Sequence, residues 1–247
     1  MLITSLNNDK IKDIIKLKEK KYRKMNKLFI IEGEHLVIEA YKKNLLKELI
    51  LLDESNLSLD IDVNTIYVTK DIMNKITDLE TSPNIVGICE IKEDYKLEGD
   101  KYLLLDNIQD PGNLGTIIRS AKAFNIDTIV LSKDTVDLYN PKVVRSTQGI
   151  MFHINIIYAD LEEVINDLKK KNIKIFGTDV NTGMTPNNIP SIDKERFALV
   201  MGNEGNGVKD SIKRLTDENL YIKMNNEVES LNVAVATSII LYEMNRR

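Results

Sequence analysis

The sequence predicts an α/β protein with two domains, a smaller N-terminal α/β domain and a larger C-terminal domain built on a parallel sheet. Short apolar runs alternate with helical patterns along the chain, which is typical of α/β folds. In the C-terminal part the apolar runs are nearly continuous, as expected for parallel strands covered on both faces. Residues 92–100 are charged and poor in core-forming side chains, so we place the linker there and the domains at 1–94 and 95–247.

The N-terminal domain is expected to open with an amphipathic helix over residues 8–24, whose apolar side chains fall roughly on one side. Its further predicted elements are a strand at 28–31, a helix at 34–43 after Gly33, strands at 49–52 and 65–68, a helix from about 69 to 77, and a strand at 85–89.

In the C-terminal domain, strands are expected at 101–105, 127–131, 154–158, 173–177, 196–201 and 219–223, and helices at 113–124, 141–148, 160–171, 207–214 and 231–244. Ligands of open α/β sheets bind beyond the carboxyl ends of the strands. Polar segments that begin at Asp106, Thr178, Gly202 and Lys223 each follow a predicted strand. We therefore expect these segments to converge on one edge of the sheet.

Composition places the chain among globular proteins, because 43% of its 247 residues are hydrophobic and 29% are charged. The single cysteine, Cys89, excludes an internal disulfide framework and fits a reducing compartment. The N-terminus lacks the charged leader and apolar core of a signal peptide, and the longest weakly polar stretch, 233–241, is too short to cross a bilayer. We therefore expect a cytoplasmic protein.

Basic residues are concentrated near the N-terminus. Residues 10–27 contain nine lysines and arginines and two acidic residues, a local net charge of +7 in a chain whose net charge is −4. A basic helix on an acidic body is typical of a surface that contacts nucleic-acid phosphates. Lys20, Lys21, Arg23 and Lys24 are the candidates for that contact; the alternative is a lysine-rich helix that is merely solvated.

The first chemistry-bearing segment runs from Asp106 to Ala121 and joins two carboxylates, a Pro-Gly turn, Asn113 and Arg119. Asn113 and Arg119 are six residues apart, somewhat under two helical turns, so both are expected to face one cleft from the start of a helix. The alternative is an Asn that caps the helix and an Arg that lies on the surface.

The second segment, Gly202 to Gly207, is a glycine-rich loop after a strand, but it lacks the Gly-Lys-Ser/Thr ending of a phosphate-binding loop. Glu204 within it would repel a phosphate, so the loop suits a neutral or cationic ligand unless it is only a tight turn. The third segment, Ser230-Leu231-Asn232, opens an apolar helix. Ser230 is a credible N-cap, and Asn232 is placed to hydrogen-bond either a substrate hydroxyl or its own backbone.

These three segments, in this order, resemble the signature of the SpoU family of RNA methyltransferases of the SPOUT superfamily. Members transfer a methyl group from S-adenosylmethionine to a ribose 2′-hydroxyl, on a parallel sheet whose chain end forms a trefoil knot. The resemblance implies that Gly202, Ile222 and Leu231 contact S-adenosylmethionine, with Thr178 on the adjacent loop as a more peripheral member. Many relatives have Pro where this chain has Lys223, a departure at the rim of the adenine pocket.

The same resemblance assigns a shared set of residues to the catalytic cleft, namely Asn113, Arg119, Glu204, Ser230 and Asn232. Family proposals make Arg119 the general base. A guanidinium is effectively always protonated, however, so an Arg119 that grips phosphate and polarises the hydroxyl is at least as plausible. No metal is expected, because the sequence has no metal-ligand cluster, and His35 is interpreted as a polar residue at a helix start.

Residues 29–40 resemble the substrate-binding domain, similar to the ribosomal protein L30e fold, that precedes many SpoU enzymes. This resemblance implies an RNA substrate, with 23S rRNA as the first choice, and places the basic first helix on it. Arg145, in a segment like the connecting helix of the family, is a further candidate that contacts either RNA phosphate or solvent. A homodimer is expected, because the active site of the family draws on both subunits.

Two other interpretations remain open at this point, and a third fails on the sequence. A tRNA ribose methyltransferase would keep the fold and change the target. An RNA-binding ribosome assembly factor would keep the fold without catalysis, although the full set of candidate catalytic residues argues against it. A doubly wound nucleotide-binding enzyme lacks its phosphate motif here.

Overall fold

The computed structural model describes residues 2–53, 55, 60–92 and 96–246, which form two compact units. The first unit contains residues 2–92 together with Asp137–Phe152, and the second contains residues 96–136 together with 153–246. The predicted boundary between residues 94 and 95 lies outside the described residues and stays a prediction. That residues 137–152 belong to the first unit was not predicted.

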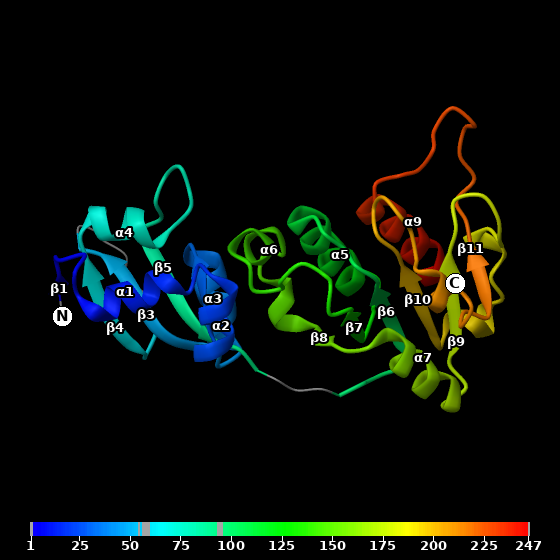
Figure 1. Ribbon diagram of the computed structural model, residues 1–247. Helices are drawn as coiled ribbons and strands as arrows, with labels where there is room; N and C mark the ends of the chain where they lie inside the picture. Colours follow the sequence, from blue (N-terminus) through cyan, green and yellow to red (C-terminus); the bar gives the residue numbers. More distant parts are fainter. Residues whose placement is uncertain (1, 54, 56–59, 93–95, 247) are drawn as a thin grey trace. The chain divides into compact units, whose positions relative to one another are not determined.

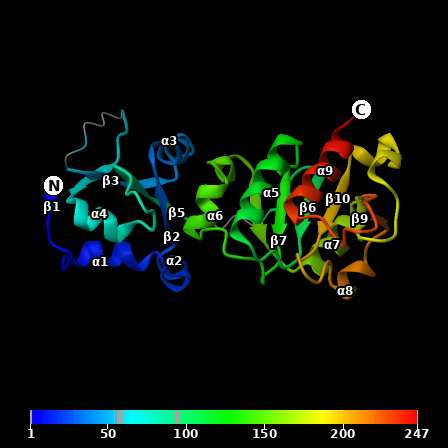
Figure 2. The ribbon, with the colours of Figure 1, turned by 90° about the horizontal axis from the view of Figure 1, so that it is seen from above.

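The first unit is built on a five-stranded sheet in the order β1 (Leu2–Ile3), β4 (Asn64–Val68), β3 (Leu46–Leu52), β5 (Ile85–Glu90) and β2 (Leu28–Glu32). Only β5 runs antiparallel to its neighbours. The helices α1 (Asp9–Lys16) and α4 (Lys70–Ile76) pack together on one side of the strands, and α3 (Glu34–Lys42) lies on the other (Figure 2). The short helix α6 (Pro141–Ser146) packs near β2.

The single helix predicted over residues 8–24 is wrong, because the chain forms α1 and then α2 (Lys20–Asn26). Leu17 turns inward and is buried, and the backbone tightens into a turn there. The break leaves the carbonyls of Leu17 and Lys18 without helical partners, and the Arg23 guanidinium donates to both, at 2.8 and 2.5 Å.

The second unit is built on a six-stranded, fully parallel sheet, which confirms the predicted fold class. The trefoil knot that the resemblance implies stays a prediction. The strands lie in the order β11 (Glu218–Leu220), β9 (Lys174–Thr178), β10 (Phe197–Met201), β6 (Lys101–Leu105), β7 (Thr128–Leu131) and β8 (Asn155–Tyr158). β11 ends at Leu220 rather than at the predicted residue 223, so Ile222 and Lys223 belong to the following loop.

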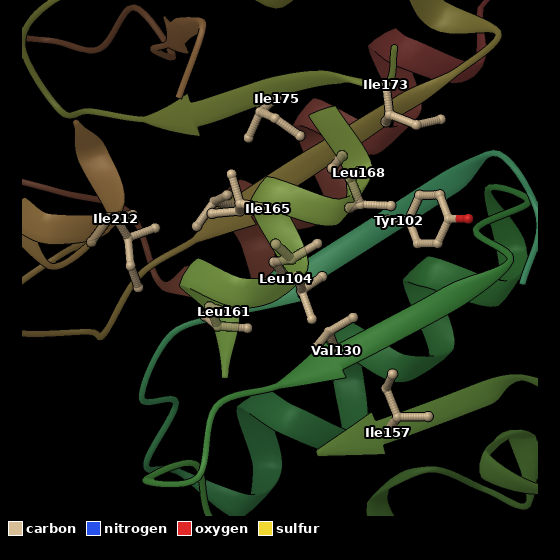
Figure 3. Close-up of a cluster of buried hydrophobic side chains, with 14 residues drawn as sticks. Tyr102, Leu104, Val130, Ile157, Leu161, Ile165, Leu168, Ile173, Ile175 and Ile212 are labelled. Carbon is tan, nitrogen blue, oxygen red and sulfur yellow. The ribbon is translucent and has the colours of Figure 1, made fainter. Parts of the chain in front are cut away.

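One face of this sheet is covered by α7 (Leu161–Lys170), whose buried Leu161, Val164, Ile165 and Leu168 recur at helical spacing. They pack on strand residues such as Leu104 in a continuous apolar cluster, with α7 in front of the strands in Figure 3. Asp160 caps the helix by accepting from the backbone N–H groups of its first turn.

The opposite face is covered by α5 (Pro111–Ala123) and α9 (Val233–Asn245), which pack side by side. The Ser120 and Ser238 hydroxyls meet at 2.7 Å between them. A long loop joins β11 to α9 and projects beyond the sheet (Figure 1). The helix α8 (Asp210–Lys213) is shorter than the predicted 207–214, because Gly207 closes the loop with Asn203 and Lys209 is the N-cap residue. Within the described residues, every helix falls short of the length and apolar character that a membrane span requires.

Replacing Ile165 by Ala is expected to lower the free energy of unfolding by about 2–5 kcal/mol, because the side chain is fully buried in the α7 cluster and its loss leaves a cavity. Ile192→Ala is the control, since Ile192 is 71% exposed, and its expected effect is below about 0.5 kcal/mol. Urea denaturation followed by circular dichroism measures both, and equal effects would contradict the packing described above.

Candidate functional site

A cavity of about 350 Å³ opens at the carboxyl ends of β9 and β10. Three chain segments and two helices form its walls. They contribute Thr178, Asp179, Val180, Met201, Gly202, Asn203, Glu204, Gly205, Asn206, Gly207, Lys213, Leu220, Ile222, Met224, Glu229, Ser230, Leu231, Val233, Ala236 and Ile240. The polar segments predicted after these strands therefore do meet at one edge of the sheet.

One wall of the cavity is a closed glycine loop. The backbone N–H groups of Asn203 and Gly207 donate to each other's carbonyls, at 3.0 and 2.9 Å. The Asn203 side-chain oxygen accepts from the N–H groups of Gly205 and Asn206, at 2.9 and 3.1 Å. A Cβ on Gly202 would lie 2.1 Å from the backbone of Gly207, so the close approach of the two ends of the loop requires glycine at residue 202.

Glu204 projects from this loop to the turn before α5. Its carboxylate accepts from the backbone N–H groups of Gln109 and Asp110, at 3.4 and 3.3 Å, and from the Asn113 side-chain amide, at 3.1 Å. The turn is itself capped by Asp110, whose carboxylate accepts from the Asn113 N–H at 2.8 Å. The acidic residue of the glycine loop is therefore tied to the first chemistry-bearing segment.

The third segment joins this network through Asn232, whose side-chain amide donates to the Asn113 side-chain oxygen at 2.9 Å. The Asn232 oxygen accepts from the N–H groups of Ala234 and Val235, which makes it the N-cap of α9. The prediction that Ser230 caps this helix is wrong, because the helix begins two residues later. Ser230 lines the cavity instead.

Arg119 is not a partner in the hydrogen bonds described above. It is exposed on α5 and is not among the residues that line the cavity. Six residues of α-helix correspond to about 600° of rotation, which leaves Arg119 about 120° around the helix from Asn113. Within the parts of the chain that the structure describes, no hydrogen bond or ion pair engages the Arg119 guanidinium. Asn113 is likewise not among the residues that line the cavity, so the expectation that Arg119 and Asn113 face one cleft stays a prediction.

The candidate cofactor residues do lie together. Gly202, Ile222 and Leu231 all line the cavity, and so does Thr178, although the Thr178 hydroxyl donates to the carbonyl of Val200 at 3.0 Å. Lys223 is exposed and outside the lining, while Met224 after it lies within it. The departure at residue 223 thus leaves the cavity wall intact.

Asp179 and Lys213 also line the cavity and were missed by the sequence analysis. The Lys213 ammonium donates to the Asp179 carboxylate at 3.0 Å. The N–H of Asn181 and then the Lys213 ammonium hold the pKa of the Asp179 carboxyl below its usual value, against the opposing effect of burial. The position of Asp179 in the sequence could have identified it, because it directly follows β9 in the same way that Asp106 directly follows β6. With Glu204 and Glu229, the lining holds three carboxylates and one ammonium, which favours a cationic ligand.

The candidate RNA-contacting residues have different environments in the first unit. Lys20, Lys21 and Lys24 are exposed on α2. Arg23 is 3% exposed and donates to Asp137 at 2.5 Å, besides the two carbonyls described above. This burial corrects the expectation for Arg23, because its guanidinium is used inside the unit and has no surface left for a phosphate.

Arg145 is partly exposed and forms an ion pair with the buried Glu32 at 2.5 Å. His35 lies at the start of α3 as interpreted, with Nε2 3.2 Å from the Gln148 carbonyl. Among the residues described, no group of three or more His, Cys, Asp or Glu side chains is arranged to hold a metal ion.

Two family models match the chain. The model of the SpoU rRNA Methylase family matches residues 100–242, and that of the MRM3-like substrate binding domain matches residues 8–87. Together they cover parts of both units described above.

Relatives of known name match over nearly the whole chain. The chain is 40% identical, over 98% of both sequences, to the 23S rRNA (guanosine(2553)-2′-O)-methyltransferase RlmP of Bacillus subtilis. It is similar to the crystal structure of an AdoMet-bound rRNA methyltransferase from Sinorhizobium meliloti, with 30% identity, a TM-score of 0.87, and coverage of 99% of this chain and 97% of that one. The AdoMet complex of the SpoU methyltransferase AviRb from Streptomyces viridochromogenes shares the fold, with 24% identity, a TM-score of 0.88, and 97% of each chain covered.

Gly202→Ala is expected to weaken the binding of S-adenosylmethionine at least about 100-fold, because the new methyl group must displace backbone that forms the cavity wall. Gly205→Ala is the matched control in the same loop, since a Cβ there meets only the Asn203 side chain, at an ordinary 3.5 Å. Isothermal titration calorimetry measures both affinities. Equal affinities for the two variants would show that the glycine loop does not form the binding wall.

Proposed function

The chain belongs to the SpoU rRNA methylase family, and on this premise we propose that it transfers the methyl group of S-adenosylmethionine to a ribose 2′-hydroxyl of 23S rRNA. The observation that carries the proposal is the hydrogen-bonded series Asn232–Asn113–Glu204, which joins the three chemistry-bearing segments beside one cavity. The choice of 23S rRNA is supported by the nearly full-length match to RlmP, whose name specifies 2′-O-methylation of a guanosine in that RNA.

The cavity fits S-adenosylmethionine in two respects. Apolar side chains such as Ile222, Leu231 and Ile240 offer a surface for an adenine ring, and the carboxylates of Asp179, Glu204 and Glu229 favour the positive charge of the sulfonium. When bound, the cofactor supplies an electrophilic methyl group. Backbone groups of the closed loop at 202–207 would hold it, with Ile222 and Leu231 as the further contacts and Thr178 at the periphery.

The chain's own residues must then position a ribose and help to remove its proton, because a hydroxyl is a poor nucleophile at neutral pH. We assign to Arg119 a grip on the RNA phosphate and polarisation of the hydroxyl, since a guanidinium stays protonated. Asn113, Glu204 and Asn232 hold the three site segments together, and Ser230, which lines the cavity, is placed to contact the nucleotide. The 2′-hydroxyl is the group that distinguishes RNA from DNA at such a site.

RNA binding is proposed for the first unit, through the exposed Lys20, Lys21 and Lys24 of α2. Arg145 is proposed as a further RNA contact, because its side chain stays partly exposed while it pairs with Glu32. We place the enzyme in the cytoplasm, where bacterial 23S rRNA is modified, and propose that it needs no metal.

A homodimer is supported by the exposed surface of α9. Val235, Ile239 and Tyr242 are exposed and recur at spacings of four and three, so they form one apolar stripe along the helix. Such a stripe is characteristic of a surface that a partner covers. Arg119 lies on the neighbouring helix α5, is exposed, and is not among the residues that line the cavity of its own chain. We propose that a second copy covers the stripe and that Arg119 serves the partner's cavity.

The proposed activity predicts that the purified protein incorporates methyl groups from S-adenosylmethionine into unmodified 23S rRNA at a single ribose. Radiolabel incorporation followed by mapping of 2′-O-methyl positions measures this. A 23S fragment with a 2′-deoxy nucleotide at the mapped position is the control and should accept no label. Incorporation into tRNA alone would contradict the proposed substrate, and no incorporation into any RNA would contradict the proposed enzyme.

Arg119→Ala is expected to abolish methylation while leaving the affinity for S-adenosylmethionine within about twofold, because Arg119 does not line the cavity. If Arg119 acts on the partner's cavity, mixed dimers of Arg119→Ala with Gly202→Ala contain one complete site and should recover a substantial part of the wild-type rate. Methylation assays on co-refolded mixtures measure this recovery. Inactive mixed dimers would instead place Arg119 in the site of its own chain.

A further inference from the structure

A buried carboxylate lies directly behind the glycine loop, outside the residues that line the cavity. Asp106 follows β6 and is 1% exposed. Its Oδ2 accepts from the backbone N–H of Lys209 at 2.9 Å. Among the described residues, its Oδ1 has no hydrogen-bond partner, and the Lys209 ammonium lies 3.6 Å from it. Burying a carboxylate costs free energy unless a cation lies nearby to compensate its charge. The nearby cation here is Lys209, which indicates a specific role for the charge of Asp106.

The loop that carries Gly202 and Glu204 is fastened at two points to the turn after β6. At its start, the Asn203 side-chain amide donates to the carbonyl of Asn107 at 2.8 Å. At its end, Lys209 is held by Asp106 through both its backbone N–H and its ammonium. Asn107 has a φ of +59°, and its own N–H donates to the Ser132 hydroxyl at 2.9 Å, so the turn that receives the loop is itself fixed.

Lys209 also reaches Asp134 at the protein surface, with its ammonium 3.2 Å from that carboxylate. The hydrogen bond to Asp134 and the charge of Asp106 raise the pKa of Lys209, so it remains a cation in the physiological range. The two carboxylates differ in what they can contribute. The side chain of Asp134 is 68% exposed, so water screens its attraction to Lys209 from both sides, whereas Asp106 is buried and its attraction to the half-exposed Lys209 is screened less.

We propose that Asp106 is a positioning residue for the methyl-donor pocket. The buried negative charge of Asp106 attracts Lys209, which follows the glycine loop. Through Lys209, Asp106 holds that end of the loop against the turn before α5, which is the turn that Glu204 contacts. The proposal rests on the proposed function in so far as the loop binds S-adenosylmethionine. It assigns a role to a residue that touches neither cofactor nor substrate.

The test is Asp106→Asn, which keeps the shape of the side chain and an acceptor for the Lys209 N–H but removes the charge. Its dissociation constant for S-adenosylmethionine, measured by calorimetry, is expected to rise at least about tenfold, which corresponds to about 1.4 kcal/mol. The turnover number at saturating S-adenosylmethionine should remain within about twofold of wild type. In the ligand-free protein, hydrogen exchange at the amides of Asn203 and Gly207 should become faster, because these amides close the loop.

Two further variants make the test specific. Asp134→Asn removes the exposed partner of the same lysine and should leave both the dissociation constant and the exchange rates nearly unchanged. Lys209→Met should weaken binding about tenfold in the wild-type background, where it leaves Asp106 uncompensated, and less than about threefold in the Asp106→Asn background.

The proposal is overturned if Asp106→Asn leaves affinity and amide exchange as in wild type, or if the Lys209→Met effect is the same in both backgrounds. Failure of the wild-type protein to bind S-adenosylmethionine would refute the proposed function instead. The exchange measurement would still decide whether Asp106 holds the loop.

Discussion

The parallel pairing of β6 with β10, in the register that sets Leu105 opposite Met201, is the constraint on which the rest of the site depends. The Asp106 N–H continues the ladder by donating to the Met201 carbonyl at 2.9 Å, so the two chains leave the sheet side by side. Residues that follow β6 and the glycine loop that follows β10 therefore face each other at contact distance. A slip of one residue would turn every side chain to the opposite face of the sheet and separate these contacts.

Ion pairs between residues far apart in the sequence decide which basic residues of the first unit remain exposed. Lys10 pairs with Glu48 and Lys18 with Asp78, so acidic side chains from other elements neutralise part of the basic N-terminal stretch. Arg23 is withdrawn into the interior by Asp137, where the pair also satisfies carbonyls freed by the break between α1 and α2. Such a buried pair contributes to the specificity of the arrangement more than to its stability. Lys20, Lys21 and Lys24 of α2 stay exposed.

Local patterns were sufficient for the fold class, the family and most of the strands, because apolar runs such as 101–105 and the order of the polar segments are properties of contiguous sequence. What they missed depends on residues far apart in the chain. The break in the helix predicted at 8–24 is stabilised by Arg23, which is itself held by a residue more than 100 positions away. Asn232 rather than Ser230 caps α9, and nothing in the local sequence distinguishes the two. The environment of Arg119 could not be predicted either, because a spacing of six residues fits both a cleft residue and the exposed residue that the structure shows.

The direction of the hydrogen bonds explains why an acidic residue occupies the glycine loop. The Asn232 oxygen is used by the N–H groups that open α9, so its amide must donate to Asn113. The Asn113 oxygen is thereby used as well, and its amide must donate to Glu204. The backbone N–H groups of the turn before α5 also point at this residue. A carboxylate can accept all of these hydrogen bonds, because both of its oxygens are acceptors. A glutamine at this residue would set its NH2 group against some of the donors. The negative charge of Glu204 also repels a phosphate from the loop. One residue, Glu204, therefore both completes the hydrogen-bond network and favours a cationic ligand.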